Sequence, residues 1–171
     1  MLPLLRIACL LMAFLLVASA PASAQVSARV EVTGAVRQSL DLDAAALAAF
    51  PAEAIGRFTQ ARSGAGASSQ STVRGVKLGA LIERAGLAPA DRDAWKTLAV
   101  IATATDGYRA VFSWPEITNT AVGEGVLVIF ERDGKPLDER EGRIALISAA
   151  DLKLGPRHVR NLKRIELRAL D

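Results

Sequence analysis

After residue 25, the apolar residues fall into short runs, and a glycine, a proline or an Asp-Gly pair separates most of these runs. The run at 26–32 alternates with polar residues, which is typical of a half-buried strand. Within 78–85 the apolar residues recur at helical spacing, but this stretch is short. Strands and helices do not alternate regularly, which disfavours a doubly wound parallel sheet. The pattern predicts one α+β domain dominated by mixed or antiparallel sheet, with short helices.

Local signals place several element boundaries. Asp43 is expected to cap a helix over 44–50, because its carboxylate can accept a free backbone N–H. Gly86 stands where a left-handed residue ends a helix. Asp106-Gly107 is a hairpin signal, and Ser113 begins a capping box for a short helix. The other expected strands are 39–42, 56–61, 97–104, 108–113, 125–132, 144–148 and 162–170.

The first 24 residues have the pattern of a secretory signal peptide. Arg6 is their only charged residue, the twelve residues at 7–18 are uncharged, and Ala22-Ser23-Ala24 supplies small residues for cleavage. Twelve apolar residues are too few to span a bilayer, which takes about 20. We therefore expect a cleaved signal peptide (1–24) and a mature domain (25–171). The mature domain is expected in the periplasm or outside the cell, with no membrane span.

The composition excludes several classes of chemistry. Cys9 is the only cysteine and leaves with the signal peptide, so the mature domain has no disulfide, thiolate ligand or cysteine nucleophile. His158 is the only histidine, and we expect no metal site. The chain carries 21 basic and 18 acidic side chains, a balance that argues against nucleic acid as a partner. The acidic residues expected at a solvated hairpin end are Asp133, Asp138, Glu139 and Glu141.

Two polar segments are candidate binding sites. The first is a Gly/Ser-rich loop expected at 62–71, whose backbone could form an anion-binding nest. The second is the basic segment 153–160, in which Arg157 is expected to be exposed. The candidate residues for binding an anion or cofactor are Arg62, Ser63, Gly64, Gly66, Arg157, His158 and Arg160. The alternatives are a flexible connector for the first segment and a solvated basic surface for the second.

Several stretches, in order, resemble the oxidoreductase molybdopterin-binding domain, which has the sulfite-oxidase fold. The first is RGVKLGALIERAGL (74–87), the second is ATDGYRAVFSWPEI (104–117), and the last is RHVRNLKRIEL (157–167). The stretch at 129–147 fits the intervening hairpin. The resemblance covers most of residues 30–168 and implies a molybdopterin-binding fold of this type.

The resemblance also implies a cysteine thiolate that binds molybdenum from the segment matching 58–74. This segment contains no cysteine, and Ala61 lies near the expected position. A serine hydroxyl is a harder and less acidic ligand, so it is a poor replacement. In the family, the segments matching 62–71 and 153–160 lie together around the anionic cofactor, and we expect the same cleft here. The resemblance further implies that those holoenzymes that are exported usually travel folded behind a twin-arginine signal, and Arg6 has no arginine neighbour.

Because the cysteine ligand and the arginine pair are both absent, we expect an exported, non-catalytic binding or interaction module without a cofactor. Its expected partner is a small anion, or a protein of the periplasm or membrane. The alternative is a molybdopterin-dependent oxidoreductase domain or subunit that holds the cofactor without a cysteine ligand. A third possibility is a sensor that detects a small anion and relays the signal to a membrane receptor.

Overall fold

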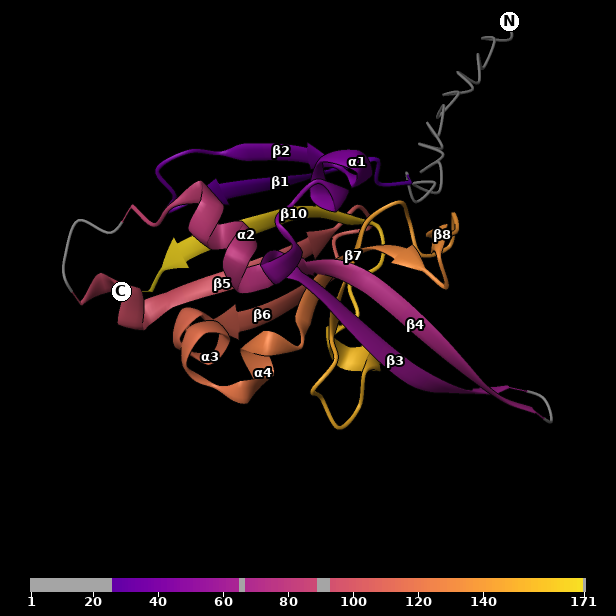
Figure 1. Ribbon diagram of the computed structural model, residues 1–171. Helices are drawn as coiled ribbons and strands as arrows, with labels where there is room; N and C mark the ends of the chain where they lie inside the picture. The colour runs from indigo at the N-terminus through magenta and orange to yellow at the C-terminus, as the bar shows by residue number, and fades with distance from the viewer. Residues whose placement is uncertain (1–25, 65–66, 89–92, 171) are drawn as a thin grey trace, which may run out of the picture.

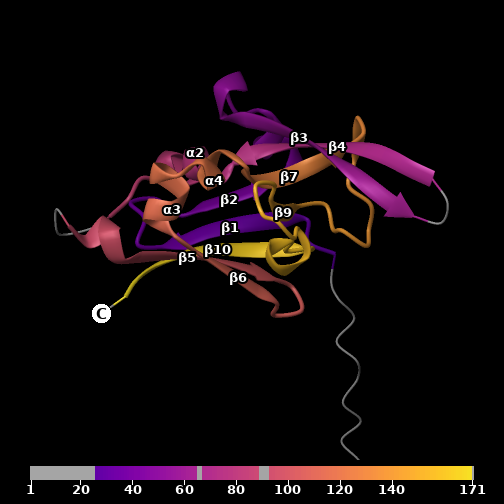
Figure 2. The same ribbon diagram turned by 90° about the horizontal axis from the view of Figure 1, so that it is seen from below.

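The structure is a computed structural model that describes residues 26–64, 67–88 and 93–170, with the side chains of 61–69 excepted. Within these ranges the chain forms two β-sheets that pack against each other, with short helices along one side (Figure 1, Figure 2). Buried residues from both sheets and from three of the α-helices share one hydrophobic core. The predicted α+β domain dominated by mixed and antiparallel sheet is confirmed.

The first sheet has the strand order β2-β1-β10-β5-β6. Strands β1 and β10 are parallel, and the other neighbours are antiparallel. In β10, Ile165 and Leu167 are buried while Arg164 is exposed, which confirms the period-two pattern of this segment. The strand bounds are β1 Arg29–Gly34, β2 Leu40–Asp43, β5 Leu98–Ala104, β6 Arg109–Ser113 and β10 Leu162–Ala169.

The second sheet has the order β3-β4-β7-β8, and β9 also pairs with β7. Strand β7 is buried on both faces: Val128 contributes to the main core, and Ile129 contributes to a smaller cluster on the other side. Burial on both faces explains why this strand is a continuous apolar run. The bounds are β3 Ile55–Gly64, β4 Ala67–Lys77, β7 Val126–Arg132, β8 Lys135–Pro136 and β9 Ala145–Ser148.

Predicted signals mark one end of three of the α-helices, although the helix expected over 44–50 ends at Ala48. The N–H of Ala46 donates to Asp43 Oδ1 at 2.8 Å, and the N–H of Glu116 donates to Ser113 Oγ at 3.1 Å. Gly86 ends a helix with a φ of +69°, in the left-handed region that favours glycine. The α-helices are α1 Ala44–Ala48, α2 Leu78–Ala85, α3 Trp114–Asn119 and α4 Ala121–Glu124. The 3₁₀ helices are η1 Ala52–Ala54, η2 Ala94–Thr97 and η3 Gly155–Arg157.

The prediction of a Gly/Ser-rich loop at 62–71 is wrong, because most of this segment lies in a long hairpin. Strands β3 and β4 pair in continuous register from Ile55↔Val76 to Gly64↔Ala67. The hairpin extends away from the body of the domain (Figure 1). Its outer part is rich in small and polar residues at successive positions, so it lacks the alternation that marks a half-buried strand. Backbone pairing, supplemented by a 2.8 Å hydroxyl bond between Thr59 and Thr72, forms the strands instead.

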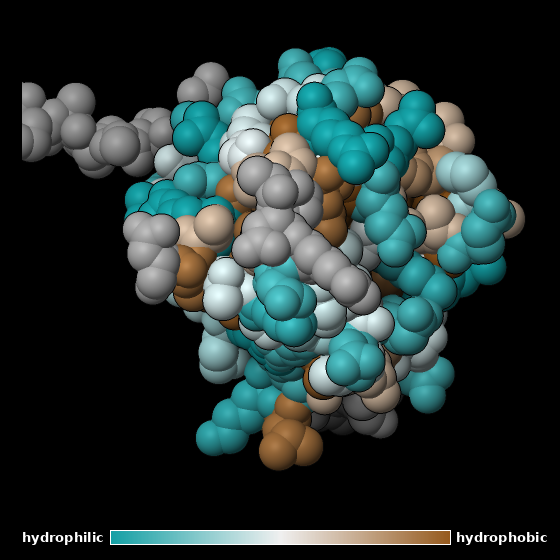
Figure 3. Space-filling model, turned by 90° about the vertical axis from the view of Figure 1, so that its left-hand side faces the viewer, coloured by the Kyte–Doolittle hydropathy of each residue, from teal (hydrophilic) through white to brown (hydrophobic). Residues whose placement is uncertain are grey.

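The surface of the domain is mixed in character. On the face shown in Figure 3, hydrophilic side chains predominate and hydrophobic ones are scattered among them. In the part of the chain that the structure describes, every helix is too short or too polar to cross a bilayer.

Candidate functional site

The segment that follows η3 is held against the second sheet. Val159 is completely buried, and it exchanges two backbone hydrogen bonds of 2.9 Å with Leu146 in β9. Its neighbours His158 and Arg160 line a cavity, His158 partly buried and Arg160 exposed. The backbone bridge therefore fixes both side chains relative to the sheet.

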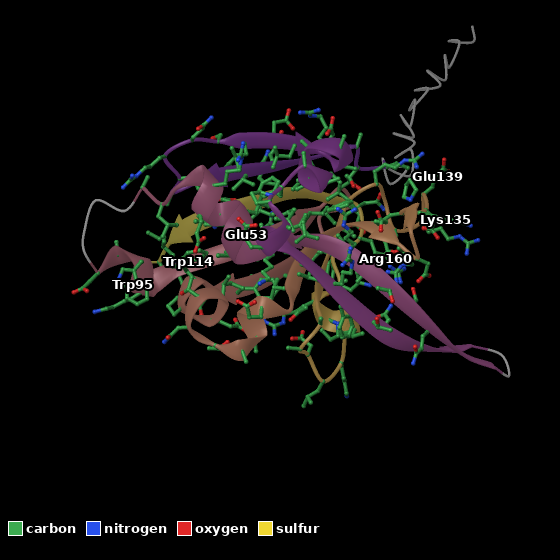
Figure 4. All side chains as sticks on the ribbon, in the orientation of Figure 1. Glu53, Trp95, Trp114, Lys135, Glu139 and Arg160 are labelled. Atoms are coloured by element: carbon green, nitrogen blue, oxygen red, sulfur yellow. The ribbon has the colours of Figure 1, made fainter. Side chains whose placement is uncertain are left out.

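His158 and Arg160 line a cavity of about 320 Å³, which we call the arginine cleft. Gln60 of β3 forms another part of its wall, so the long hairpin and the segment 153–160 meet here. Figure 4 labels Arg160, which lies near the hairpin. The complete lining is Gln60, Arg132, Asp138, Arg140, Glu141, His158 and Arg160.

A buried carboxylate organises this cleft. Glu141, only 8% exposed, accepts bonds of 2.6 Å and 3.0 Å from Arg132 Nη2 and Nε. Its Oε1 also lies 2.9 Å from His158 Nε2. Burial raises the pKa of Glu141, but the hydrogen bonds with His158 and Arg132 outweigh burial and lower this pKa to about 2. The expected solvated position of Glu141 is therefore wrong, because its charge is paired inside the fold.

The arginine cleft carries surplus positive charge. Its three arginines outnumber its two carboxylates, and one of these carboxylates, Glu141, is paired with Arg132. The second, Asp138, accepts the backbone N–H of Glu141 at 2.8 Å. Arg140 and Arg160 are exposed and form no ion pair within the described residues. Two guanidinium groups thus remain available to a ligand, and their planar donors suit phosphate, sulfate or carboxylate.

Arg157 has a different position from the one expected. Its Nε donates to Asp151 Oδ2 at 2.7 Å, and its Nη1 donates to Glu116 Oε1 at 2.8 Å. Its third nitrogen also donates to Asp151, and the guanidinium lies 4.6 Å from the centre of the Phe112 ring. Hydrogen bonds from Arg157 lower the pKa of Asp151 against the opposing effect of burial. The expectation of an exposed Arg157 is wrong: the side chain joins the 149–157 segment to α3.

The structure places only part of the predicted site. Arg62, Ser63 and Gly64 lie in the outer part of β3, where side chains are outside the described set, and Gly66 lies outside the described residues. The expected cleft between 62–71 and 153–160 stays a prediction, because the described lining of the arginine cleft includes Gln60 but no residue of 62–71. The buried Ser71 lies beside this lining, and its hydroxyl accepts from Arg132 Nη1 at 3.1 Å. The cleft residues missed from the sequence are Gln60, Arg132, Asp138, Arg140 and Glu141.

A second cavity, of about 300 Å³, adjoins the cleft at His158 and Arg160. We call it the Tyr108 cavity, and its other lining residues are Ala104, Asp106, Tyr108 and Gly155. Among the described residues, no group of three or more histidine, cysteine, aspartate or glutamate side chains is arranged to hold a metal ion. The exposed guanidinium group of Arg160, which lines both cavities, is a donor suited to an anionic ligand.

Comparison with known proteins agrees with this architecture. Residues 18–170 match the sequence profile of a family described as the oxidoreductase molybdopterin binding domain. Among solved structures, the chain is similar to the sulfane dehydrogenase SoxCD from Paracoccus pantotrophus, with a TM-score of 0.61 and 17% identity. This likeness covers 83% of the present chain and 39% of the other, and it confirms the sulfite-oxidase type of fold. No curated protein sequence matches the chain.

The family match also corrects the sequence analysis on one point. The absent cysteine led to the expectation that no cofactor binds. That expectation is wrong, because the matched family is one of molybdopterin-binding domains. The missing thiolate concerns only the way in which a metal would be held. The organic part of the cofactor depends instead on the fold and on the arginine cleft.

Proposed function

The chain belongs to the oxidoreductase molybdopterin-binding domain family, and on this premise we propose that it is an exported domain that binds an anionic ligand of the molybdopterin class. The ligand occupies the arginine cleft, with its phosphate between Arg140 and Arg160. The observation that carries the proposal is this pair of exposed guanidinium groups. Neither group forms an ion pair with a carboxylate among the described residues.

The residues present fit one part of such a cofactor and not the other. Arg140, Arg160 and the amide of Gln60 are hydrogen-bond donors suited to a phosphate. No cysteine follows Cys9 in the sequence, so this domain offers no thiolate to a molybdenum ion. We therefore propose that the domain holds its ligand by the organic, anionic end and that its role is binding rather than redox chemistry at a protein-ligated metal.

Export is part of the same proposal and has a consequence for ligand uptake. The segment 1–24 has the pattern of a signal peptide without an arginine pair, which favours passage across the membrane in an unfolded state. An unfolded chain cannot carry a bound ligand, because the cleft joins residues far apart in sequence, such as Gln60 and Arg160. The ligand is taken up after the domain folds outside the cytoplasm.

Calorimetric titration with inorganic phosphate tests the proposal. Wild-type protein is expected to bind phosphate, and Arg160→Ala is expected to weaken binding by about tenfold, because a charge-assisted hydrogen bond is lost. Arg37→Ala is the matched control. This exposed arginine lies in the connection between β1 and β2, at the end of the sheet away from the hairpin (Figure 1).

The control makes the result specific to the cleft. Arg37→Ala is expected to leave phosphate affinity unchanged, although it removes the same charge. Equal weakening by both substitutions would indicate diffuse attraction to a basic surface and would overturn the proposed site. Absence of phosphate binding to the wild-type protein would overturn the proposed function.

A further inference from the structure

The arginine cleft and the Tyr108 cavity are adjacent, because His158 and Arg160 line both. The two cavities differ in chemistry. The arginine cleft presents guanidinium groups, whereas the Tyr108 cavity presents one carboxylate, an aromatic ring and the small residues Ala104 and Gly155. A single ligand that contacts both therefore needs an anionic end and a chemically different second end.

Asp106 gives the Tyr108 cavity its specific chemistry. Its Oδ1 accepts the backbone N–H of Tyr108 at 2.9 Å, which fixes the carboxylate within the β5–β6 turn. Its Oδ2 has no hydrogen-bond partner within the described residues. Asp106 and Arg160 line the same cavity but form no ion pair with each other. A negative and a positive group are thus held apart across a space that a ligand can fill.

Tyr108 supplies a planar surface in the same cavity. Its hydroxyl donates to the backbone carbonyl of Pro156 at 2.6 Å, which ties the β5–β6 turn to η3. The residue remains 44% exposed. A tethered but exposed aromatic ring favours stacking with a flat ring of a ligand. A carboxylate at the edge of such a surface favours a ring that carries N–H donors.

We infer that one ligand spans both cavities, with its phosphate in the arginine cleft and an amino-substituted pyrimidinone ring in the Tyr108 cavity. Asp106 is the specificity-determining residue, because its carboxylate accepts N–H donors from the amino-substituted edge of the ring. Adjacent ring and exocyclic N–H groups present two donors side by side, a pattern that matches a carboxylate as a guanidinium does. This inference rests on the proposed function and adds the ring recognition to it.

Calorimetry with two nucleotides tests the inference on the purified protein. Guanosine 5′-monophosphate carries the exocyclic amino group next to the ring N–H, and inosine 5′-monophosphate lacks only that amino group. Wild-type protein is expected to bind the guanosine nucleotide about tenfold more tightly than the inosine nucleotide. The reason is that only the guanosine nucleotide can donate the charge-assisted hydrogen bond of the exocyclic amino group. Asp106→Asn is expected to abolish this preference and to leave the affinity for inorganic phosphate unchanged.

The asparagine variant keeps the turn intact, because its side-chain oxygen can still accept the N–H of Tyr108. Unchanged phosphate binding then serves as the check that the variant is folded. Phosphate binding by the wild type without a preference between the nucleotides would overturn the ring inference and leave the proposed function standing. A preference that survives in Asp106→Asn would overturn the role of Asp106. Failure of phosphate and both nucleotides to bind would overturn the proposed function itself.

Discussion

His158 Nε2 lies 2.9 Å from Glu141 Oε1, and this contact lies at the wall of the arginine cleft. Glu141 is at the same time paired with Arg132, which also contacts Ser71 in the long hairpin. The network therefore joins the hairpin, the end of β7 and the segment after η3. A buried carboxylate that connects three chain segments stabilises the fold as well as shaping the cleft.

The first prediction concerns acid stability. The pKa of Glu141 is lowered from 4.5 to about 2 in the folded protein. Its stabilising effect is therefore present above pH 4.5 and is lost as the pH falls toward 2. At pH 7, Glu141→Gln is expected to reduce the free energy of unfolding by up to about 3 kcal/mol. Urea unfolding at pH 7 and near pH 2 should show this deficit shrinking at the lower pH.

The matched control for this prediction is Glu139→Gln. Glu139 is exposed and lies two residues from Glu141 (Figure 4), so its substitution is expected to change stability by less than about 0.5 kcal/mol. A deficit for Glu141→Gln that is the same at both pH values would contradict the role assigned to its charge.

The second prediction concerns Arg157 as a structural residue. Arg157→Met is expected to destabilise the protein by about 2 kcal/mol, because it leaves the carboxylates of Asp151 and Glu116 without their cation. Lys163→Ala, at an exposed position of β10, is the control and should have little effect. Chemical denaturation of both variants provides the measurement. Similar stabilities for the two would show that the Arg157 cluster contributes no more than a surface charge.

The third prediction concerns the glycine at the end of β1. Gly34 has a φ of +90°, and a Cβ there would lie 2.0 Å from the carbonyl oxygen of Leu167. Gly34→Ala is therefore expected to cost more than about 2 kcal/mol, since both backbone strain and a backbone clash oppose it. Gly134→Ala separates the two effects, because Gly134 has a φ of +74° and open space around it. Thermal unfolding should show a smaller loss for Gly134→Ala, and equal losses would contradict the close approach of β1 to β10.

The fourth prediction concerns export. Protein recovered from the periplasm of a bacterial host is expected to begin at Gln25, as determined by intact mass. Ala24→Leu places a large residue next to the proposed cleavage site and should block processing. A wild-type product that keeps residues 1–24, or that stays in the cytoplasm, would contradict the signal peptide.

The sequence predicts the fold best where local chemistry decides it. Asp43, Gly86 and Ser113 mark helix ends that the structure confirms, because capping depends on neighbouring residues alone. The outer hairpin was missed, because its backbone pairing needs no apolar alternation. Elements too short to show a period, such as α4 and β8, were missed for a similar reason.

The cleft was harder to predict than the fold. The sequence assigns Arg157 to the ligand site and Glu141 to solvent. Both errors arise from pairing across sequence distance, since Arg157 meets Glu116 and Glu141 meets His158. A formal charge in a sequence does not reveal whether another side chain has already neutralised it. Conversely, among the three arginines that line the cleft, the structure shows that Arg132 is paired, whereas Arg140 and Arg160 form no ion pair within the described residues.

The most direct test of the account is retention of molybdopterin by the purified protein. Molybdopterin released from a molybdoenzyme is dialysed to equilibrium against the wild-type protein, Arg160→Ala and Arg37→Ala, and the bound pterin is measured as its fluorescent oxidation product. We predict retention close to one pterin per wild-type protein, similar retention by Arg37→Ala, and a loss of about tenfold in affinity for Arg160→Ala. No retention by the wild-type protein, or equal retention by all three proteins, would contradict a molybdopterin site in the arginine cleft.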